Sequence, residues 1–363
     1  MINNSILKSE ERFSFALRSL YSRFGYGRYK MNKFEEYDLY VRNKDFLISD
    51  GVITFTDTNG KLLALKPDVT LSIIKNTKDV KGYVQKLYYD EHVYRISKDS
   101  HSFREIAQTG LECIGDIGVT DICEVIYLSL MSLNSISESY ILDLSHAGLM
   151  TALFDSVGLS KKDKSRVVSL INEKNYDGVK LFGEKVSALA KALMTSRKDL
   201  DVIKEAAKPY FENPEVKKSF DEFEEIYSCL CKLGMKEKIN IDFSIVSDIS
   251  YYSGTLFKGY VEGIPAGVLS GGQYDGLMKK MGKSSGAVGF AVYLDMLERF
   301  GGEEKEYDYD TVVIVSEKTP PEKVIKTVSD LSSKGERVIA LKSVSDTVRY
   351  KNIVRIWEGE GND

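Results

Sequence analysis

The spacing of apolar residues over the first 155 positions alternates between that of helices and that of strands. Residues 11–25 place apolar side chains at helical intervals and predict an amphipathic helix. Strand-like stretches follow at 37–42 and 52–66, and Asn59-Gly60 within the second one is a strong signal for a hairpin turn. Two longer stretches, 83–96 and 104–114, predict an antiparallel pair of strands. The block closes with a predicted helix, a strand and another helix, at 122–133, at 140–145 and from about 148.

The pattern changes at about residue 156 and again at about residue 239. Residues 156–238 keep apolar side chains at helical spacing with few turn signals, which predicts a helical insertion. Strand character resumes at 239–246, so we expect a discontinuous core whose two parts are residues 1–155 and 239–302. After a charged linker, residues 303–363 predict a small α/β unit with the order strand, helix, strand, strand.

The segment 249–298 is rich in glycine and tyrosine and predicts a small-ligand pocket bounded by close-packed backbone. Its first strand is expected to continue from Tyr251-Tyr252 through Phe257. Gly271-Gly272 suggests a tight turn with positive φ, and an amphipathic helix is predicted to open at Gly289. The spacing of these glycines fits neither a dinucleotide-binding fingerprint nor a P-loop.

Composition and charge exclude several classes of protein. The chain of 363 residues has a formal net charge of −4, so no global field draws it to nucleic acid or to an anionic membrane. We find no long apolar segment that resembles a signal peptide or a membrane span, and we expect a cytoplasmic protein. Cys229 and Cys231 lie close in sequence but have no neighbouring histidine, so we interpret them as buried helix residues and expect neither metal nor cofactor.

The first candidate site residues are Asp68 and Thr70, at the point where a predicted strand turns into a helix. A carboxylate in this place commonly caps the helix by accepting hydrogen bonds from free amide groups of its first turn. The same carboxylate could hold the ammonium group of a small amino acid. The sequence pattern leaves both interpretations open.

The second set comes from the predicted strand pair. Because side chains alternate between the two faces of a strand, Gln108 and Glu112 share one face, with Gly110 between them. Two polar groups separated by a gap are typical of the floor of a ligand site, although a solvated sheet face has the same pattern. Arg95, on the preceding strand, could reach an anion or Glu112. Tyr251 and Tyr252 complete the candidates, and half-buried packing is the alternative for both.

Taken together and in this order, these motifs resemble the catalytic core of class II aminoacyl-tRNA synthetases. Within that class they resemble the histidyl-tRNA synthetases and their paralogue, the regulatory subunit of ATP phosphoribosyltransferase. The resemblance extends from about Glu10 to Phe300. It is carried by LKPDVT, VYRISKDSHSFREIAQTGLECIGD, ILDLSHAGL, ISYYSGTLFKGY, GGQYDGL and GAVGFAVYLDML.

The resemblance implies an α+β fold with a six-stranded antiparallel sheet flanked by helices, in a homodimer. It also implies roles for the candidate residues. Asp68 and Thr70 would lie near the ammonium group of histidine, and Arg95 near its carboxylate or a phosphate. The rest of the ligand would be surrounded by Gln108, Glu112 and Tyr251 or Tyr252.

Departures from the synthetase pattern favour the regulatory paralogue. Ser247 and Met296 stand where a histidyl-tRNA synthetase has arginines that neutralise the phosphates of ATP, and a buried phosphate without such donors is costly. Asp68 replaces a glutamate, a change that the regulatory paralogues tolerate. The residues after Phe300 are few for an anticodon-binding domain, and they carry ten Lys and Arg against thirteen Asp and Glu, which makes tRNA binding unfavourable.

The resemblance thus implies a non-catalytic subunit in histidine biosynthesis. Such a subunit binds and activates the short-form catalytic subunit of ATP phosphoribosyltransferase in a hetero-oligomer, and it senses histidine for feedback inhibition. Two alternatives remain at this point: an active or degenerate histidyl-tRNA synthetase, and a stand-alone amino-acid-binding module.

Overall fold

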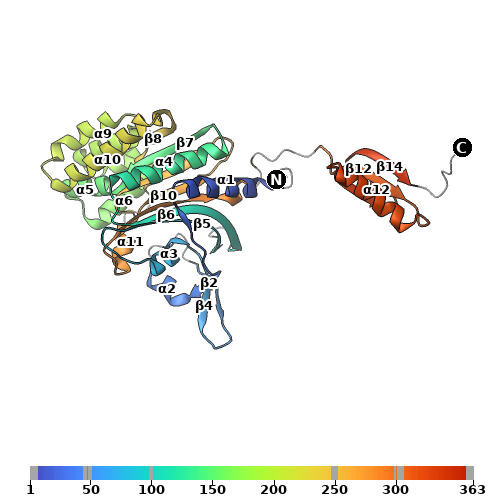
Figure 1. Ribbon diagram of the computed structural model, residues 1–363. Coiled ribbons are helices and arrows are strands. Elements are labelled where there is room, and N and C mark those ends of the chain that lie inside the picture. Colours follow the sequence, from blue (N-terminus) through green and yellow to red (C-terminus); the bar gives the residue numbers. More distant parts are fainter. Residues whose placement is uncertain are drawn as a thin grey trace. The chain divides into compact units, whose positions relative to one another are not determined.

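The computed structural model describes residues 7–43, 47, 51–97, 101–246, 252–297, 300 and 306–356. The chain divides into two compact units, Met1–Gly301 and Gly302–Asp363 (Figure 1). Each unit has its own sheet, and the first contains all the candidate site residues that the structure describes.

The first unit is built on a mixed sheet that has eight strands in the described part of the chain. Its strand order is β1-β5-β6-β11-β10-β9-β7-β8. The expectation of a six-stranded antiparallel sheet is therefore wrong for the sheet as a whole. The six strands from β5 to β7 pair antiparallel, but the short edge strands β1 and β8 add parallel pairs. The strands are β1 (Gly27–Arg28), β5 (Val84–Ile96), β6 (Phe103–Gly115), β7 (Tyr140–His146), β8 (Ile239–Ile241), β9 (Thr255–Val261), β10 (Leu269–Gln273) and β11 (Gly286–Tyr293).

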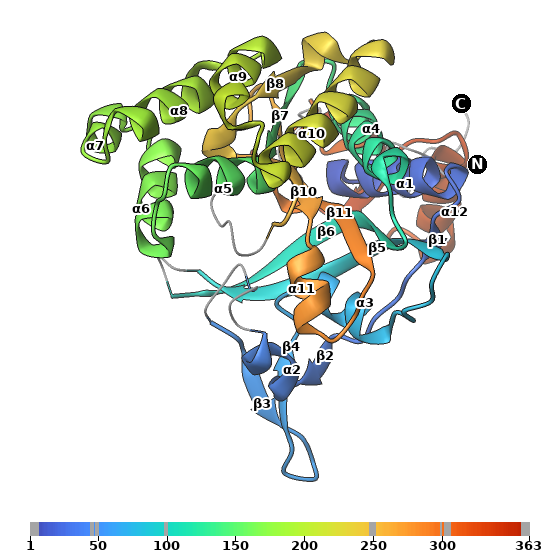
Figure 2. The ribbon, with the colours of Figure 1, turned by 90° about the vertical axis from the view of Figure 1, so that its left-hand side faces the viewer.

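Helices cover both faces of this sheet, so each face has its own apolar core (Figure 2). On one face, α1 (Ser9–Arg23) and α4 (Val119–Ile136) pack against residues such as Leu111 and Phe290. On the other face, α3 (Thr70–Asn76) and α11 (Asp275–Lys280) pack against Ile114 and Ala287 in a smaller cluster. The alternation along β6 therefore directs Leu111 to one core and Glu112 to the other.

A second, three-stranded sheet has the order β2-β4-β3. It consists of β2 (Phe34–Glu36), β3 (Thr54–Thr56) and β4 (Leu62–Leu65), followed along the chain by α3. The predicted hairpin is confirmed, and Gly60 adopts a φ of +80°, which favours glycine. The predicted strand at 37–42 is wrong, because this stretch forms α2 (Tyr37–Arg42). Tyr37 and Tyr40 are three residues apart and pack on one helical face in the smaller core.

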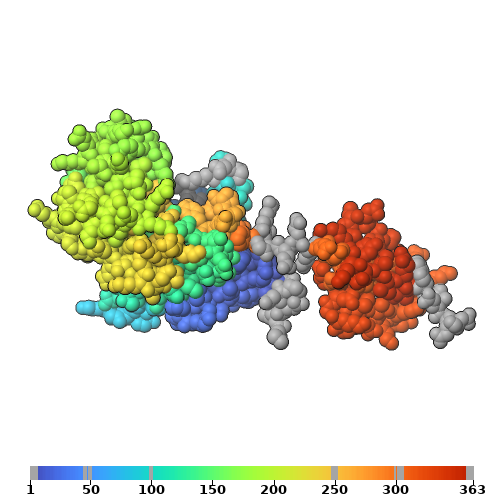
Figure 3. Space-filling view, turned by 90° about the horizontal axis from the view of Figure 1, so that it is seen from above, coloured from blue at the N-terminus to red at the C-terminus, as the bar shows by residue number. Residues whose placement is uncertain are grey.

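Between α5 (Ala147–Ser156) and β8, the chain is helical. The helices are α6 (Lys161–Asn172), α7 (Tyr176–Lys180), α8 (Glu184–Thr195), α9 (Leu200–Ala207) and α10 (Pro214–Lys232). Figure 3 shows their atoms, green to yellow, as one block at a side of the first unit. Cys229 and Cys231 lie in helix α10, as predicted, but they are partly exposed and not fully buried.

The helix α4 is long and apolar enough to cross a membrane by length and composition alone, with a mean hydropathy of 1.3. In this fold it is a core helix. Its buried side chains, among them Val125, Leu128 and Leu133, belong to the larger apolar core over the sheet. Tertiary packing therefore accounts for its apolar character.

The glycine-rich segment differs from its prediction in two places. Gly271 and Gly272 lie inside strand β10 and do not have positive φ, so they form no tight turn. The predicted helix opening at Gly289 is instead strand β11, followed by a short 3₁₀ helix, Leu294–Leu297. Along β11 the larger Val288, Phe290 and Val292 face the main core. The opposite face carries the small Ala287, Gly289 and Ala291 before it ends at Tyr293. The two glycines and two alanines of β11 concealed this alternation in the sequence.

The second unit contains one parallel sheet of three strands in the order β13-β12-β14. Its elements follow the predicted order strand, helix, strand, strand. They are β12 (Tyr309–Val315), α12 (Pro321–Ser333), β13 (Val338–Leu341) and β14 (Tyr350–Ile356).

Candidate functional site

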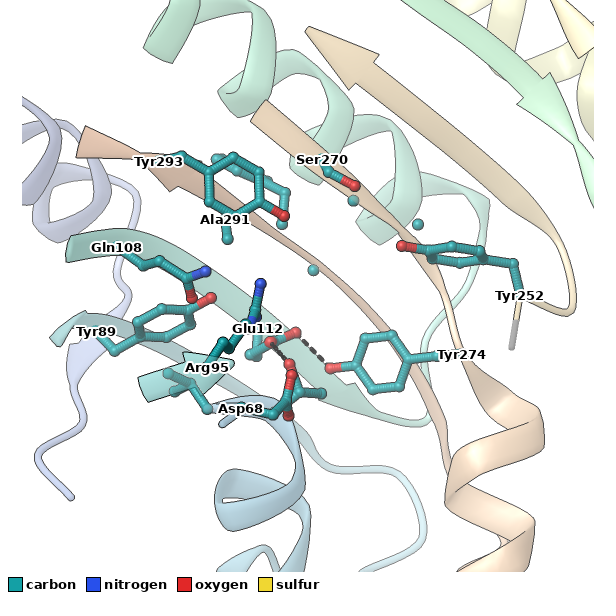
Figure 4. A pocket seen from close by; sticks show the side chains of 16 residues that line it. Asp68, Tyr89, Arg95, Gln108, Glu112, Tyr252, Ser270, Tyr274, Ala291 and Tyr293 are labelled. Carbon is teal, nitrogen blue, oxygen red and sulfur yellow. Dashed lines mark hydrogen bonds between the residues drawn. The ribbon is translucent and has the colours of Figure 1, made fainter. Parts of the chain in front are cut away.

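A narrow pocket lies against the central strands of the large sheet, on the face that carries α3 (Figure 4). Its lining comes from β5, β6, β10 and β11, from the start of α3, and from Tyr252 just before β9. The pocket encloses about 50 Å³ and adjoins a cleft of about 940 Å³. Pocket and cleft share Arg95, Tyr252 and Tyr293, so a bound amino acid would occupy the pocket together with the mouth of the cleft.

Glu112 is the most deeply enclosed charged group of the pocket, with 2% of the residue exposed. Its carboxylate accepts a hydrogen bond of 2.7 Å from the Thr70 hydroxyl and another from the Tyr274 hydroxyl. Gly289 pairs with Glu112 across the sheet, and a Cβ at Gly289 would lie 1.7 Å from Glu112 Oε2. Because Gly289 has no side chain, the space beside it is free for the Glu112 carboxylate. Burial raises the pKa of Glu112 from its ordinary 4.5 to about 8, despite the two hydrogen bonds.

Asp68 bonds to the first turn of α3 and also lines the pocket. Its Oδ1 accepts a hydrogen bond of 2.8 Å from the backbone N–H of Leu71, in the first turn of α3. Asp68 also lines the pocket, where it is 8% exposed. Burial raises the pKa of Asp68, and the Leu71 N–H and the nearby Arg95 charge oppose that rise. A cationic group placed in the pocket would further favour the ionised carboxylate.

Arg95 supplies positive charge at the junction of the pocket and the cleft. Its Nε donates a hydrogen bond of 3.0 Å to the carbonyl oxygen of Pro67, one residue before Asp68. Gln108, only 4% exposed, precedes Glu112 on β6 and lies on the same face of the strand. The alternative of a solvated sheet face is wrong for Gln108 and Glu112, because both are buried in the pocket wall.

Tyr252 closes the pocket on the side opposite to Gln108 and Tyr89 (Figure 4). Its ring lies over Gly272, where an added Cβ would come within 2.7 Å of the ring carbons. Its hydroxyl interacts with Ser270, and burial raises its pKa above the ordinary value. The other tyrosine of the predicted pair, Tyr251, lies outside the described residues, as does Ser247.

Sequence reasoning missed four polar residues of the pocket, namely Tyr89, Ser270, Tyr274 and Tyr293. Two of them had a signal in the sequence. Tyr89 pairs with Gly110, so a tyrosine stands opposite a glycine on neighbouring strands. Tyr293 follows Gly289 and Ala291 at period two, which predicts a pocket-facing side chain once residues 286–293 are recognised as a strand.

The pocket therefore brings together six of the seven candidate residues: Asp68, Thr70, Arg95, Gln108, Glu112 and Tyr252. It presents two carboxylates near one guanidinium, with amide and hydroxyl groups between them. This arrangement offers groups of both charges to a small zwitterion. In the adjoining cleft, Met296 is 41% exposed and offers no charge to a phosphate.

A buried ion pair supports the segment that carries Asp68. Lys66 Nζ lies 2.6 Å from Glu91 Oε2, and the Lys66 side chain is 1% exposed. We expect Lys66→Met to lower the free energy of unfolding by about 3 kcal/mol, because it leaves the Glu91 carboxylate partly buried without its partner. Chemical denaturation of the single variant and of the double variant K66M/E91L measures this. The double variant should recover at least half of the loss, and no recovery would contradict the pairing argument.

The fold and this pocket are those of the class II aminoacyl-tRNA synthetase-like proteins. The family model described as histidyl-tRNA synthetase matches residues 4–297, and the chain belongs to this family. It is 31% identical over 293 residues to the ATP phosphoribosyltransferase regulatory subunit of Clostridium botulinum (strain Langeland), with 77% of this chain and 69% of the relative covered. Relatives from Clostridium novyi and a Thermoanaerobacter species carry the same name.

Solved structures agree on the fold. An ATP phosphoribosyltransferase regulatory subunit/histidyl-tRNA synthetase from Bacillus halodurans matches with a TM-score of 0.76 at 24% identity, covering 96% of this chain and 93% of that one. The ATP phosphoribosyl transferase (HisG:HisZ) complex from Thermotoga maritima contains a chain that matches with a TM-score of 0.62 at 20% identity. That match covers 77% of this chain and 96% of the other. The predicted resemblance to this family is confirmed.

Proposed function

We propose that this chain is a regulatory subunit of ATP phosphoribosyltransferase, which activates a short-form catalytic subunit and binds histidine as a feedback inhibitor. It carries out no phosphoryl or adenylyl transfer of its own. The names of the curated relatives support the regulatory role, and the matching Thermotoga maritima complex supports a catalytic partner. We further propose a homodimer within a cytoplasmic hetero-oligomer, without tRNA binding.

The observation that carries the histidine assignment is the enclosed charge pattern of the pocket. The cationic groups of histidine face Asp68 and Glu112, and its carboxylate faces Arg95. Gln108 and Tyr252 enclose the remainder of the ligand. Because Asp68, Gln108 and Glu112 are buried, their hydrogen bonds to an amino acid are made with little competition from water.

The absence of catalysis rests on the adjoining cleft. Arg95 and Arg104 line it, but Met296 occupies the position that resemblance to the synthetases assigns to a phosphate-binding arginine. An amino-acid pocket that lacks this cation can bind the effector without activating it. Histidine can then regulate the partner if it binds the active and inactive assemblies with different affinity, typically by about 1–3 kcal/mol.

Calorimetric titration of the purified chain with L-histidine tests the proposal, with ATP and other amino acids as controls. We expect histidine-selective binding, and histidine-dependent pyrophosphate exchange should stay at the background level. Exchange at enzyme-like rates would instead establish a synthetase. Selective binding of a different amino acid would assign the pocket to a stand-alone amino-acid-binding module.

A further inference from the structure

The side chain of Tyr252 forms a wall between three cavities. It lines the pocket, the cleft and a third cavity of about 480 Å³. The third cavity lies between α5 and α10 and is also lined by His146, Glu222 and Gln273. Besides the contacts of its ring with Gly272 and of its hydroxyl with Ser270, the position of Tyr252 depends on the chain segment that carries it.

Gln273, at the end of β10, provides that anchor. Its carbonyl oxygen accepts a hydrogen bond of 3.1 Å from Ser253 N–H, and its side-chain Oε1 accepts one of 2.6 Å from Thr255 N–H. The amide group also fills the space beside Gly254, where an added Cβ would lie 2.1 Å from Gln273 Oε1. Ser253 and Thr255, which follow Tyr252 by one and three positions, are thus both hydrogen-bonded to Gln273.

The orientation of the Gln273 side chain depends in turn on α10. Since its Oε1 accepts from Thr255 N–H, the amino group of Gln273 is left to donate. Gln273 and Glu222 line the same cavity, and Gln273 contributes to lowering the pKa of Glu222. His146 approaches the same carboxylate, with Nε2 at 3.5 Å from Glu222 Oε1. Nδ1 of His146 accepts from Leu149 N–H, so the proton of the neutral ring is on Nε2 and points to Glu222.

The contacts of Glu222 with His146 and Gln273 lie between packed side chains and open space. His146 is 2% exposed, and its Nε2 has no hydrogen-bond partner in the described residues closer than the Glu222 carboxylate. A cavity of about 480 Å³ lies beside them, while α10 itself is packed through Phe220, Phe223 and Ile226 in the larger core. The pKa of Glu222 is lowered, first by the contact with His146 and also by Gln273, so the group is ionised near neutral pH.

We propose that Glu222 of α10 is a positioning residue for Tyr252, acting through Gln273 and its bonds to Ser253 and Thr255. The helical segment between α5 and β8 is thereby coupled energetically to the ligand pocket. A carboxylate suits this place because two donors converge on it. An amide would turn its own N–H groups toward one of these donors, and Gln273 cannot rotate in compensation without losing the bond from Thr255.

Hydrogen exchange of the ligand-free protein tests the positioning. In E222Q, we expect the peptide containing Ser253 and Thr255 to exchange at least tenfold faster than in the wild type, with the β5 and β6 peptides unchanged. Glu224→Gln is the matched control, because Glu224 is on the same helix and pairs with Lys204 at 2.7 Å. Its exchange at Ser253 and Thr255 should stay within twofold of wild type. E222A should repeat the effect of E222Q.

Unchanged exchange at Ser253 and Thr255 in E222Q would overturn the proposal, and so would equal acceleration in β5 and β6, which indicates general loss of stability. The coupling to histidine rests on the proposed function and has its own measurement. We expect E222Q to weaken histidine binding at least fivefold and E224Q to leave it unchanged. A wild-type protein that binds no histidine would contradict the proposed ligand, while the exchange result would still decide the role of Glu222.

Discussion

Glu112→Gln is expected to make the protein more stable above pH 7 while weakening histidine binding. In the wild type, the Glu112 carboxyl ionises near pH 4.5 in the unfolded chain but holds its proton up to about pH 8 in the folded pocket. Rising pH between these values therefore favours the unfolded state and removes stability. The loss amounts to about 4 kcal/mol by pH 8, at about 1.4 kcal/mol for each pH unit.

The glutamine side chain cannot ionise, so E112Q avoids this loss. The difference in free energy of unfolding between variant and wild type should be small at pH 4 and grow steadily toward pH 8. Denaturant titrations at a series of pH values measure it. Glu105→Gln is the control, because Glu105 is an exposed residue of the same strand, β6. A pH-independent difference would show that Glu112 is already ionised in the free pocket.

The same variant should bind histidine ten- to a hundredfold more weakly, because a hydrogen bond to a charged group contributes about 1.5–3 kcal/mol. Histidine binding to the wild type should release a proton from Glu112 near pH 7, since a cationic ligand group favours the ionised carboxylate. Calorimetry in buffers of different ionisation enthalpy detects this proton, and E112Q should lose the buffer dependence. Unchanged affinity would remove Glu112 from the ligand site.

Gly289→Ala is expected to abolish histidine binding and to destabilise the fold. The added Cβ would lie 1.7 Å from Glu112 Oε2 and 2.5 Å from the carbonyl oxygen of Leu111. The Glu112 side chain must therefore leave its place between Thr70 and Tyr274. We expect histidine affinity to fall at least a hundredfold and the free energy of unfolding to fall by about 2 kcal/mol, as is usual for overpacked cores.

A control variant at a strand glycine with free space beside it separates this effect from the general cost of replacing glycine. Gly27 lies in β1 of the same sheet, and a Cβ there meets only the carbonyl oxygen of Lys86 at 3.9 Å. Gly27→Ala should leave both the thermal midpoint and the histidine affinity near those of the wild type. Normal histidine binding by G289A would mean that Glu112 can move aside without a role in recognition.

The buried wall of the pocket could be predicted from sequence where a single periodicity determined it. Alternation along residues 104–114 placed Gln108 and Glu112 on one face, and the structure has both in the pocket. The same rule failed at residues 286–293, where small side chains at successive positions fit helical and strand spacing alike. Sequence reasoning therefore missed Tyr293, although it had identified the segment as part of a pocket.

The sheet and the small helix α2 show where sequence signals are too short. The edge strands β1 and β8 contain two and three residues, and they form by pairing with longer strands already in place. No periodicity can be detected over such lengths. At residues 37–42, burial of Tyr40 in the smaller core outweighs the alternation of the stretch.

The separation of the two cores by the large sheet has a consequence for how such a protein can change over evolutionary time. The larger cluster, beneath α1 and α4, contains no residue of the Asp68, Thr70 and Glu112 group, which lies on the other face. Substitutions that abolish a reaction in the pocket therefore leave most of the apolar burial intact. A gene duplicate of an enzyme with this architecture can lose its chemistry in a few steps, remain folded, and be selected for a new task while its pocket still discriminates among small molecules.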